Sequence, residues 1–380
     1  SIMLRAWRKY CRVMPRARSA NCSAKLRSSL SSGNIVANFY KWIGNLAQNI
    51  LLVKLSSLGD VVHSFAAVSD MAAQADARIT WAVEEAFAPL AAMHPAVDRV
   101  VAVPMRRLRK HSRLWWRSAE WRQVIAALRA QEYAAVIDAQ GLIKSAVLAH
   151  LASPAPHCGY DWQSAREGWA SLFYQHKAQV PRLQHAVLRT RQLCAFALAY
   201  ALPPTEDFAL PQWQGRQSRD LVFLHGATWS SKLLPESTWL ELILLAQQAG
   251  YRVRLLWGNA EEEARAQRLA AASQAEVITK MSLPEIAQLL RESAAVLSVD
   301  TGLGHLAAAQ GVPVLGLFAA TDAALSGMRG ARAENLSRSR PCMKKDCRRH
   351  GAATANACMA AWSAAEIWTA FQDTIQRVSL

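Results

Sequence analysis

The chain has 380 residues, 52% of them hydrophobic and 19% charged, which is too long for one ordinary core and suits two soluble, globular domains. It contains no run of 18 or more apolar residues, so we expect no membrane-spanning helix. Its net charge of +16 favours an anionic partner, such as nucleic acid, anionic lipid or a phosphorylated substrate.

Residues 1–49 are a basic extension with nine Lys or Arg, no Asp or Glu and no clear periodicity. This composition fits a transit peptide or translated sequence ahead of a misplaced start. We favour the second, because "ILLVKL" at 50–55 is typical of the first strand of a fold, and we otherwise expect disorder. Without those nine cations the net charge falls to +7, so we expect no nucleic-acid partner.

The elements predicted from Ile50 onward alternate short apolar runs with amphipathic stretches. Strands are predicted at 49–55, 78–84, 97–104 and 133–140, and helices at 60–74, 86–94, 117–131 and 142–152. This alternation is typical of βαβ units around a parallel sheet. We assign 50–205 to a first Rossmann-like domain.

The proline-rich stretch 201–220 interrupts the alternation, and we predict an interdomain linker at 206–220. Strands are then predicted at 221–226, 251–258, 275–280, 294–300 and 312–318, and helices at 235–249, 261–272, 282–292 and from 304. We assign 221–360 to a second Rossmann-like domain and 361–380 to a C-terminal helix that packs back on the first. The expected fold class is therefore α/β, with two doubly wound domains facing across a cleft, where ligands bind at the carboxyl ends of the strands.

The stretch "LVKLSSLGDVVHS" at 52–64 joins an apolar strand to a helix through two serines, a glycine and Asp60. A carboxylate at this position either caps the helix or takes a proton from a substrate. The residues alone leave both functions open.

The stretch "VLSVDTGLGHLAAA" at 296–309 places Asp300 at a strand end, Thr301 and Gly302 in a tight turn, and His305 at a helix start. Backbone N–H groups at a helix start hold phosphate, and a carboxylate there accepts hydrogen bonds from sugar hydroxyls. The alternative is an ordinary capped turn, but four polar or special residues in one turn favour a binding site.

Two further strand ends carry polar groups. In "LHGATWSSKLLPESTW" (224–239), Thr228, Ser230, Ser231 and Lys232 form a polar loop in which Lys232 either neutralises a diphosphate or is merely solvated. In "LLWGNAEEE" (255–263), Gly258 precedes three acids that include Glu262, and acids in the first turn of a helix are ordinarily capping residues.

Three basic stretches follow strands of the first domain, and we place them on loops at the strand ends. They are "RRLRK" at 106–110, "DAQGLIKSA" with Gln140 and Lys144, and "DWQSARE" with Arg166. A run of charge is usually a solvated face, but three such clusters in one domain favour an anionic substrate docked there.

No G-x-G-x-x-G, P-loop or D-x-D motif occurs, which argues against nicotinamide binding, a kinase and a metal-clamped nucleotide sugar. Cys342, Cys347 and Cys358 have the spacing C-x4-C-x10-C, whereas zinc sites use two closely spaced pairs. We expect structural or unpaired thiols there and no metal. Seven cysteines at irregular spacing, without a secretory signal, favour a reducing compartment.

Several motifs in order resemble the bacterial lipopolysaccharide heptosyltransferases of glycosyltransferase family 9, which have the two-domain GT-B fold, and the likeness is greatest to type I members. They are "VKLSSLGDVVHS", "VVAVPMRRLRKH", "YAAVIDAQGLIKSA", "GYDWQSARE", "QHAVLRTRQL", "KMSLPEIAQLL" and "VLSVDTGLGHLAAA", within 50–380. The resemblance implies transfer of L-glycero-D-manno-heptose from ADP-heptose to Kdo of Kdo2-lipid A, with inversion and without a metal or other cofactor. It also implies a cytoplasmic enzyme, peripheral on the anionic inner membrane, and we expect a monomer.

The same resemblance implies roles for individual residues. Asp60 would be the general base, Thr228 and Lys232 would hold the donor phosphates, and Glu262 would hold the ribose. Asp300, Thr301, Gly302 and His305 would bind the heptose and diphosphate. The acceptor would meet Arg106, Arg107, Lys110 and Arg166, beside the anion-binding candidates Gln140 and Lys144, with Ser57 and Gly59 letting the chain turn tightly beside a bulky sugar.

The chain departs from this family in three places. Ala227-Thr228 stands where type I members often have two threonines, which puts one hydroxyl contact in doubt. The three-cysteine segment is similar to type II members, and residues 1–49 match nothing in the family. The alternatives are therefore a type II enzyme, another family 9 transferase with a different acceptor, or a non-enzymatic basic anion-binding protein.

Overall fold

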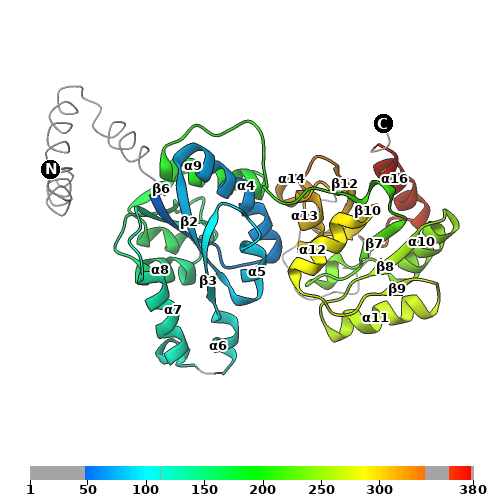
Figure 1. The fold of residues 1–380 in the computed structure, drawn as a ribbon, viewed down its shortest axis with the longest axis horizontal. Coiled ribbons are helices and arrows are strands. Elements are labelled where there is room, and N and C mark those ends of the chain that lie inside the picture. The colour runs from blue at the N-terminus through cyan, green and yellow to red at the C-terminus, as the bar shows by residue number, and fades with distance from the viewer. Residues whose placement is uncertain (1–47, 112, 339–358, 378–380) are drawn as a thin grey trace, which may run out of the picture.

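The computed structural model describes residues 48–111, 113–338 and 359–377 as two lobes, each built on one sheet (Figure 1). Within those ranges, no helix is long and apolar enough to cross a membrane. The predictions for residues 1–47 and for Cys342, Cys347 and Cys358 lie outside the described residues.

The first sheet has the strand order β3-β2-β1-β4-β5-β6, and every neighbouring pair is parallel. Its strands are β1 (Gln48–Val53), β2 (Ala77–Glu84), β3 (Val97–Val103), β4 (Ala135–Asp138), β5 (His157–Tyr160) and β6 (His176–Ala178). Its helices are α4 (Leu58–Ala75), α5 (Ala88–Ala91), α6 (Met105–His111), α7 (Ala119–Arg129), α8 (Ile143–Ala152) and α9 (Ala186–Leu198), with short 3₁₀ helices η1 (Glu85–Phe87), η2 (Trp115–Arg117) and η3 (Gly168–Phe173).

The second sheet repeats this plan in the order β12-β11-β10-β7-β8-β9, again with parallel neighbours. Its strands are β7 (Asp220–Leu224), β8 (Arg252–Leu255), β9 (Glu276–Val277), β10 (Ala295–Val299), β11 (Val314–Phe318) and β12 (Ala333–Ser337). Its helices are α10 (Glu236–Gln248), α11 (Ala260–Ala271), α12 (Leu283–Glu292), α13 (Gly302–Ala309), α14 (Ala323–Ser326) and α16 (Ala364–Gln376), with η4 (Gly215–Gln217) and η5 (Ser230–Lys232).

Both strand orders are the 3-2-1-4-5-6 order of a doubly wound Rossmann sheet, so the predicted fold class is confirmed. Continuous apolar runs form the central strands, because a parallel sheet covered by helices on both faces buries every side chain. Residues 50–53 of β1, for example, are fully buried. In each sheet the strand order reverses beside the first strand, between β1 and β4 and between β7 and β10.

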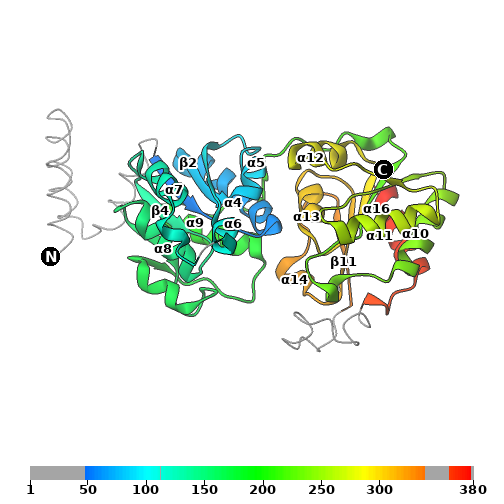
Figure 2. The same ribbon diagram turned by 90° about the horizontal axis from the view of Figure 1, so that it is seen from below.

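The two domains meet through three pairs of helices. Helix α4 contacts α13, α5 contacts α12, and α9 contacts α14. The first two pairs lie side by side in Figures 1 and 2. At the centre of this contact, a Cβ added to Gly302 would lie 2.5 Å from Leu58 Cδ2 and 3.0 Å from the Gly59 nitrogen. Only residues without a side chain allow the starts of α4 and α13 to approach so closely.

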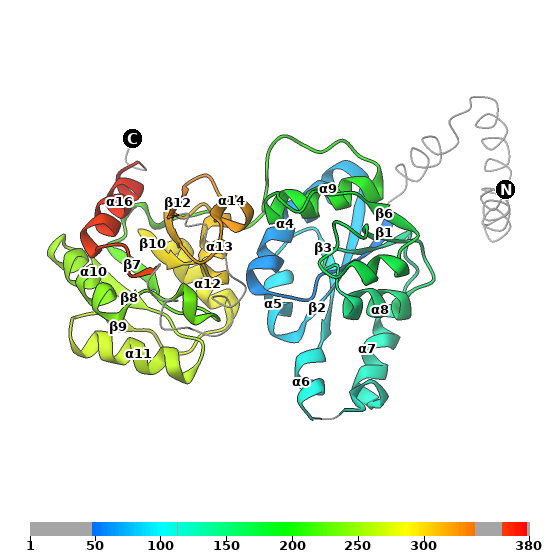
Figure 3. The same ribbon diagram turned by 180° about the vertical axis from the view of Figure 1, so that it is seen from behind.

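Two expectations about local structure were wrong. The C-terminal helix α16 does not pack on the first domain: Ile367, Trp368 and Phe371 join the core of the second domain, beside α10. The "RRLRK" stretch is not a loop but most of helix α6, which lies with α7 at one end of the first domain (Figure 3). The predicted linker 206–220 ends at the first residue of β7 and contains η4.

Candidate active site

The loops at the two switch points carry most of the predicted site residues. Asp60 follows β1 and Gln140 follows β4 in the first domain. Thr228 and Lys232 follow β7, and Asp300 follows β10, in the second. Ligands of doubly wound sheets bind where the strand order reverses, so the fold gathers these residues at the expected positions.

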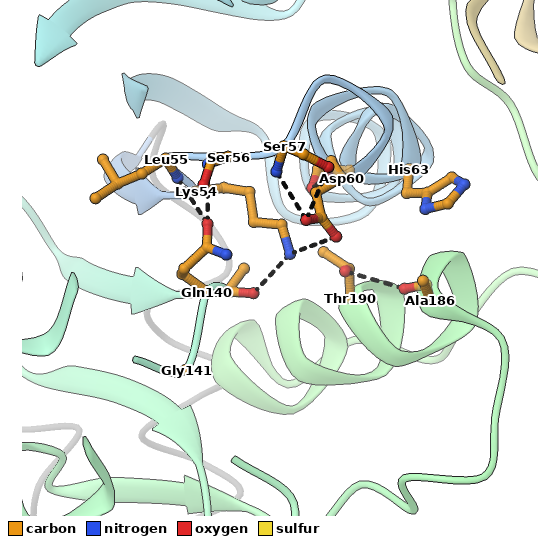
Figure 4. Close-up of polar contacts among 12 residues, drawn as sticks. Lys54, Leu55, Ser56, Ser57, Asp60, His63, Gln140, Gly141, Ala186 and Thr190 are labelled. Atoms are coloured by element: carbon orange, nitrogen blue, oxygen red, sulfur yellow. Dashed lines mark hydrogen bonds and ion pairs between the residues drawn. The ribbon is translucent and has the colours of Figure 1, made fainter. Parts of the chain in front are cut away.

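Asp60 caps helix α4 and also meets a lysine (Figure 4). Its Oδ2 accepts hydrogen bonds from the Ser57 N–H at 2.7 Å and the Ser57 hydroxyl at 3.3 Å. Its Oδ1 lies 3.6 Å from Lys54 Nζ, and the Asp60 side chain is 28% exposed. The carboxylate therefore does cap the helix, and it keeps one oxygen that this cap does not use.

The charge state of Asp60 follows from its neighbours. Burial raises the pKa of this carboxyl, but the Lys54 ammonium, the Ser57 N–H and the more distant Arg166 together lower it below its usual value. Asp60 is consequently ionised at neutral pH, which is the state that can accept a proton.

Lys54 was not predicted as a site residue from the sequence, although a lysine at the end of an apolar strand could have indicated it. Its side chain is buried, and its Nζ donates a hydrogen bond to the Ala139 carbonyl at 3.1 Å. Gln140 holds the same loop, because its Oε1 accepts hydrogen bonds from the Leu55 and Ser56 N–H groups, each at 3.0 Å. Contact of Gln140 with an acceptor stays a prediction.

On the second domain, Asp300 is surrounded by three partners. Its Oδ2 lies 2.6 Å from Lys232 Nζ and accepts a 2.6 Å hydrogen bond from the Thr321 hydroxyl, and its Oδ1 lies 3.3 Å from His305 Nε2. Burial raises the pKa of Asp300, but His305 and Lys232 outweigh it and hold the pKa well below its usual range. Thr321 had no signal in the sequence, since it lies 21 residues downstream.

A pocket of about 310 Å³ lies next to this group in the second domain. Thr228 and Glu262, which the sequence placed on separate strand ends, both line it. The Glu262 carboxylate accepts a 2.8 Å hydrogen bond from the Gly258 N–H, and it lies so close to Gly226 that a Cβ there would be 2.5 Å from its Cδ. The pocket is lined by Ala227, Thr228, Trp229, Ser230, Leu233, Asn259, Glu261, Glu262 and Arg265.

The remaining donor candidates stand at the start of α13. Thr301 is its N-cap and Gly302 its first residue, so backbone N–H groups there point out of the helix start. On the first domain, Ser57 is the N-cap of α4, and Gly59 lies against His305: an added Cβ would be 3.0 Å from its Cδ2. Gly59 thus has a packing role between the domains, and its contact with an acceptor stays a prediction.

The basic candidates divide into paired and unpaired side chains. Arg107 hydrogen-bonds both Glu85 and Glu120, so its guanidinium already has two carboxylate partners. Arg106 lies 3.9 Å from Glu84 and over the Phe87 ring.

Lys144 has both cations and acids near it, and Glu84 and Glu167 partly oppose the lowering of its pKa. Burial, followed by the charges of Arg106 and Arg109, lowers its pKa. Among the residues that the structure describes, Lys144, Arg109, Lys110 and Arg166 form no ion pair. Lys144 and Arg109, which repel one another, would be stabilised by an anion.

No group of three or more His, Cys, Asp or Glu side chains suited to a metal ion occurs in the described part of the chain, which leaves out the three-cysteine segment.

Comparisons with known proteins agree on one family. Residues 121–353 match glycosyltransferase family 9 (heptosyltransferase). The chain is 46% identical over 308 residues to lipopolysaccharide heptosyltransferase 1 of Pseudomonas aeruginosa, covering 78% of this chain and 87% of that protein. It is 45% identical over 294 residues to the Escherichia coli K12 protein of the same name, covering 73% of this chain and 90% of that protein.

Solved structures give the same result. The fold matches E. coli heptosyltransferase WaaC with ADP at a TM-score of 0.75 and 38% identity, over 86% of this chain and 99% of that one. A match at 17% identity to E. coli ADP-heptose lps heptosyltransferase II, with a TM-score of 0.70 over 87% of this chain and 100% of that one, shows the shared fold alone.

Proposed function

The chain belongs to glycosyltransferase family 9, the heptosyltransferases, and on that premise we propose that it transfers L-glycero-D-manno-heptose from ADP-heptose to Kdo of Kdo2-lipid A. The relatives at 45–46% identity are named lipopolysaccharide heptosyltransferase 1, which favours the inner core as the place of the reaction. E. coli WaaC has been solved with ADP and with ADP-2-deoxy-2-fluoro heptose, which favours ADP-heptose as the donor.

The proposed chemistry is a single in-line displacement with inversion. Asp60 removes the proton of a Kdo hydroxyl as its oxygen attacks the anomeric carbon of the heptose. The bond from that carbon to the β-phosphate oxygen breaks, and ADP leaves with the electron pair. Charge on the departing phosphate is stabilised by Lys232 and by the backbone N–H groups at the start of α13, and such preorganised charge is often the largest catalytic contribution.

One observation carries this proposal: Gly59, the neighbour of Asp60, packs against Gly302 and His305 at the start of the helix that follows Asp300. The ionised Asp60 carboxylate of the first domain is therefore next to the start of α13 in the second domain, where backbone N–H groups can bind phosphate. Lys232 forms an ion pair with Asp300 in this structure. When the donor binds, its diphosphate would have to replace Asp300 as the partner of the Lys232 ammonium group.

The test is to incubate the purified chain with ADP-heptose and Kdo2-lipid A and to read the product by mass. Asp60→Asn keeps one acceptor oxygen for the helix cap but cannot take a proton, so kcat should fall about 10²–10⁴-fold with donor affinity nearly unchanged. A chelator should leave the wild-type rate unchanged if the reaction needs no metal. Product formed only from an already heptosylated acceptor would instead identify a type II activity.

We further propose that Lys144, Arg109, Lys110 and Arg166 each meet the carboxylate or phosphates of the acceptor. Lys110→Ala should raise the acceptor KM about 10-fold or more, since a charged hydrogen bond contributes on the order of 1.5–3 kcal/mol. Arg107→Ala should raise it less, because Glu85 and Glu120 already neutralise that guanidinium. An equal rise for the two variants would contradict this division of roles.

Peripheral contact with the anionic cytoplasmic face of the inner membrane is proposed from neighbouring apolar side chains. Trp162, Trp169 and Leu172 are 49%, 62% and 64% exposed, and the two indole rings are 4.9 Å apart at the centroids. Their segment includes Arg166 and contacts α8, which carries Lys144. Exposed aromatic rings beside cations suit an anionic lipid surface.

Vesicles containing phosphatidylglycerol test this contact. Trp162→Ser, Trp169→Ser and Leu172→Ser together should abolish co-sedimentation, whereas Leu244→Ser, which removes a 41% exposed leucine from α10 of the other domain, should not. Loss of binding in both variants would refute a specific surface. Size-exclusion chromatography with light scattering tests the expected monomer.

A further inference from the structure

Three buried histidines meet where α4 packs on α13. His63 comes from α4, His305 from α13, and His185 is the N-cap of α9. His63 Nε2 lies 3.2 Å from His305 Nδ1, and these two rings, from different domains, are 242 residues apart in the chain. The His63 ring points away from the Asp60 carboxylate, so it is not part of the Asp60 hydrogen-bond group (Figure 4).

The proton on His305 can be assigned from its neighbours. The Asp300 carboxylate is ionised and only accepts, so His305 Nε2, at 3.3 Å, must carry a proton and donate. Asp300 already forms an ion pair with Lys232 at 2.6 Å, and a second buried cation on His305 would leave an uncompensated charge. A neutral His305 protonated on Nε2 has a bare Nδ1, which accepts a hydrogen bond.

His63 is therefore the donor across the interface. Burial, together with the Lys54 ammonium, holds the pKa of His63 well below its usual value, so its ring is neutral. Its Nε2–H then donates to His305 Nδ1.

His185 is not an alternative partner for His305. Its Nδ1 accepts a hydrogen bond from the Val187 N–H at 3.2 Å, and its Nε2 donates to the Gly327 carbonyl at 2.9 Å. Both of its ring nitrogens are therefore occupied, and it packs edge-on against His63 with centroids 5.5 Å apart.

We propose that His63 is a positioning residue for the donor site, although it belongs to the opposite domain. It fixes the proton of His305 on the side that faces Asp300, and so it orients the carboxylate that pairs with Lys232. When the domains separate, water replaces His63 as the hydrogen-bond partner of His305 Nδ1. His305 and Asp300 are then no longer held in place by the hydrogen bond from His63. Donor affinity is then coupled to the contact between α4 and α13. The inference rests on the proposed function for its kinetic part only.

Histidine nitrogen NMR on the full chain without substrate tests the protonation pattern directly. In the wild-type protein, His305 should be neutral and protonated on Nε2, with its Nδ1 accepting a hydrogen bond. His63→Phe keeps a ring of similar shape without a donor, and it should remove that hydrogen-bond signature. His63→Gln carries an amide N–H near the place of Nε2, and it should restore it. A wild-type His305 that is protonated on Nδ1 would overturn the inference.

The kinetic test uses the same variants with ADP-heptose and Kdo2-lipid A. His63→Phe should raise the donor KM about 5–10-fold, the loss expected for one hydrogen bond, with the acceptor KM unchanged, and His63→Gln should recover most of it. The matched control is His94→Gln, because His94 is also buried in the first domain but bonds to Ser69. Equal rises in both KM values, or no recovery in His63→Gln, would reject positioning. Absence of turnover by the wild-type chain would reject the proposed function and leave the NMR result to decide the inference.

Discussion

Replacing Lys54 with methionine should show whether Asp60 titrates in the reaction. Lys54 is buried, and its Nζ lies 3.6 Å from Asp60 Oδ1. Two unit charges at that separation attract by about 4–5 kcal/mol at an effective dielectric constant of about 20. Asp60 is 28% exposed, so solvent screens part of this attraction, and about 1.5–2 kcal/mol is a reasonable remainder.

That energy favours only the ionised form of Asp60, so its loss raises the pKa of the carboxyl. Since about 1.4 kcal/mol corresponds to one pKa unit, the acid limb of kcat/KM should move up by somewhat more than one pH unit in Lys54→Met. In the wild-type enzyme, kcat/KM should stay constant down to a lower pH than in Lys54→Met, because the wild-type pKa of Asp60 is below its usual value. At high pH the variant should retain much of its activity.

The assay is the pH dependence of kcat/KM for heptose transfer, with circular dichroism at each pH to exclude unfolding. Lys54→Arg is the matched control, because it keeps a cation and should leave the limb near the wild-type position. Lys54→Met also removes the bond to the Ala139 carbonyl, so its kinetics should be measured well below its unfolding temperature. An acid limb that stays in place in Lys54→Met would mean that Asp60 only caps the helix.

Three further predictions concern stability and the domain contact. Arg191→Met should lower the free energy of unfolding, measured in urea, by about 3–5 kcal/mol. The substitution leaves the Asp70 carboxylate, which is only 5% exposed, without the guanidinium that binds it at 2.7 and 3.2 Å. Adding Asp70→Leu should recover part of the lost stability. Gly302→Ala should push α13 from α4 and reduce turnover, because the new Cβ lies 2.5 Å from Leu58 Cδ2 and 2.7 Å from Leu58 Cβ. Leu58→Gly in the same chain removes both atoms and should restore part of the turnover, and unchanged turnover in Gly302→Ala would show that the helices can shift freely. Burial lowers the pKa of His94 to about 4, so the unfolded state binds its proton first as the pH falls. Stability from neutral His94 is complete above about pH 6.5 and is lost toward pH 4, about 2 kcal/mol by pH 5, and urea titrations should show a flatter pH dependence in His94→Gln.

Much of the fold follows from local pattern. Strands buried on both faces are continuous apolar runs, and helices between them have an apolar stripe, so the alternation alone indicated two doubly wound sheets. Asp60, Lys232 and Asp300 were recognised because each lies in the segment that follows such a strand, and the end of a strand is a property of neighbouring residues. Short elements such as β5 and β6, and helix α6 within a basic run, had too little periodicity to be separated from loops.

Other features depend on contacts between distant parts of the chain. The apolar face of α16 is visible in the sequence, but amphipathic periodicity does not say which domain that face covers. In the sequence, Lys54 is one more residue of an apolar strand, and only the fold brings the Asp60 carboxylate close to it. His305 was predicted as a donor ligand but His63 was not, and only the packing of α4 on α13 brings their ring nitrogens to 3.2 Å. Sequence periodicity reflects which face of an element is buried, whereas a hydrogen bond between residues 242 positions apart depends on how whole domains pack.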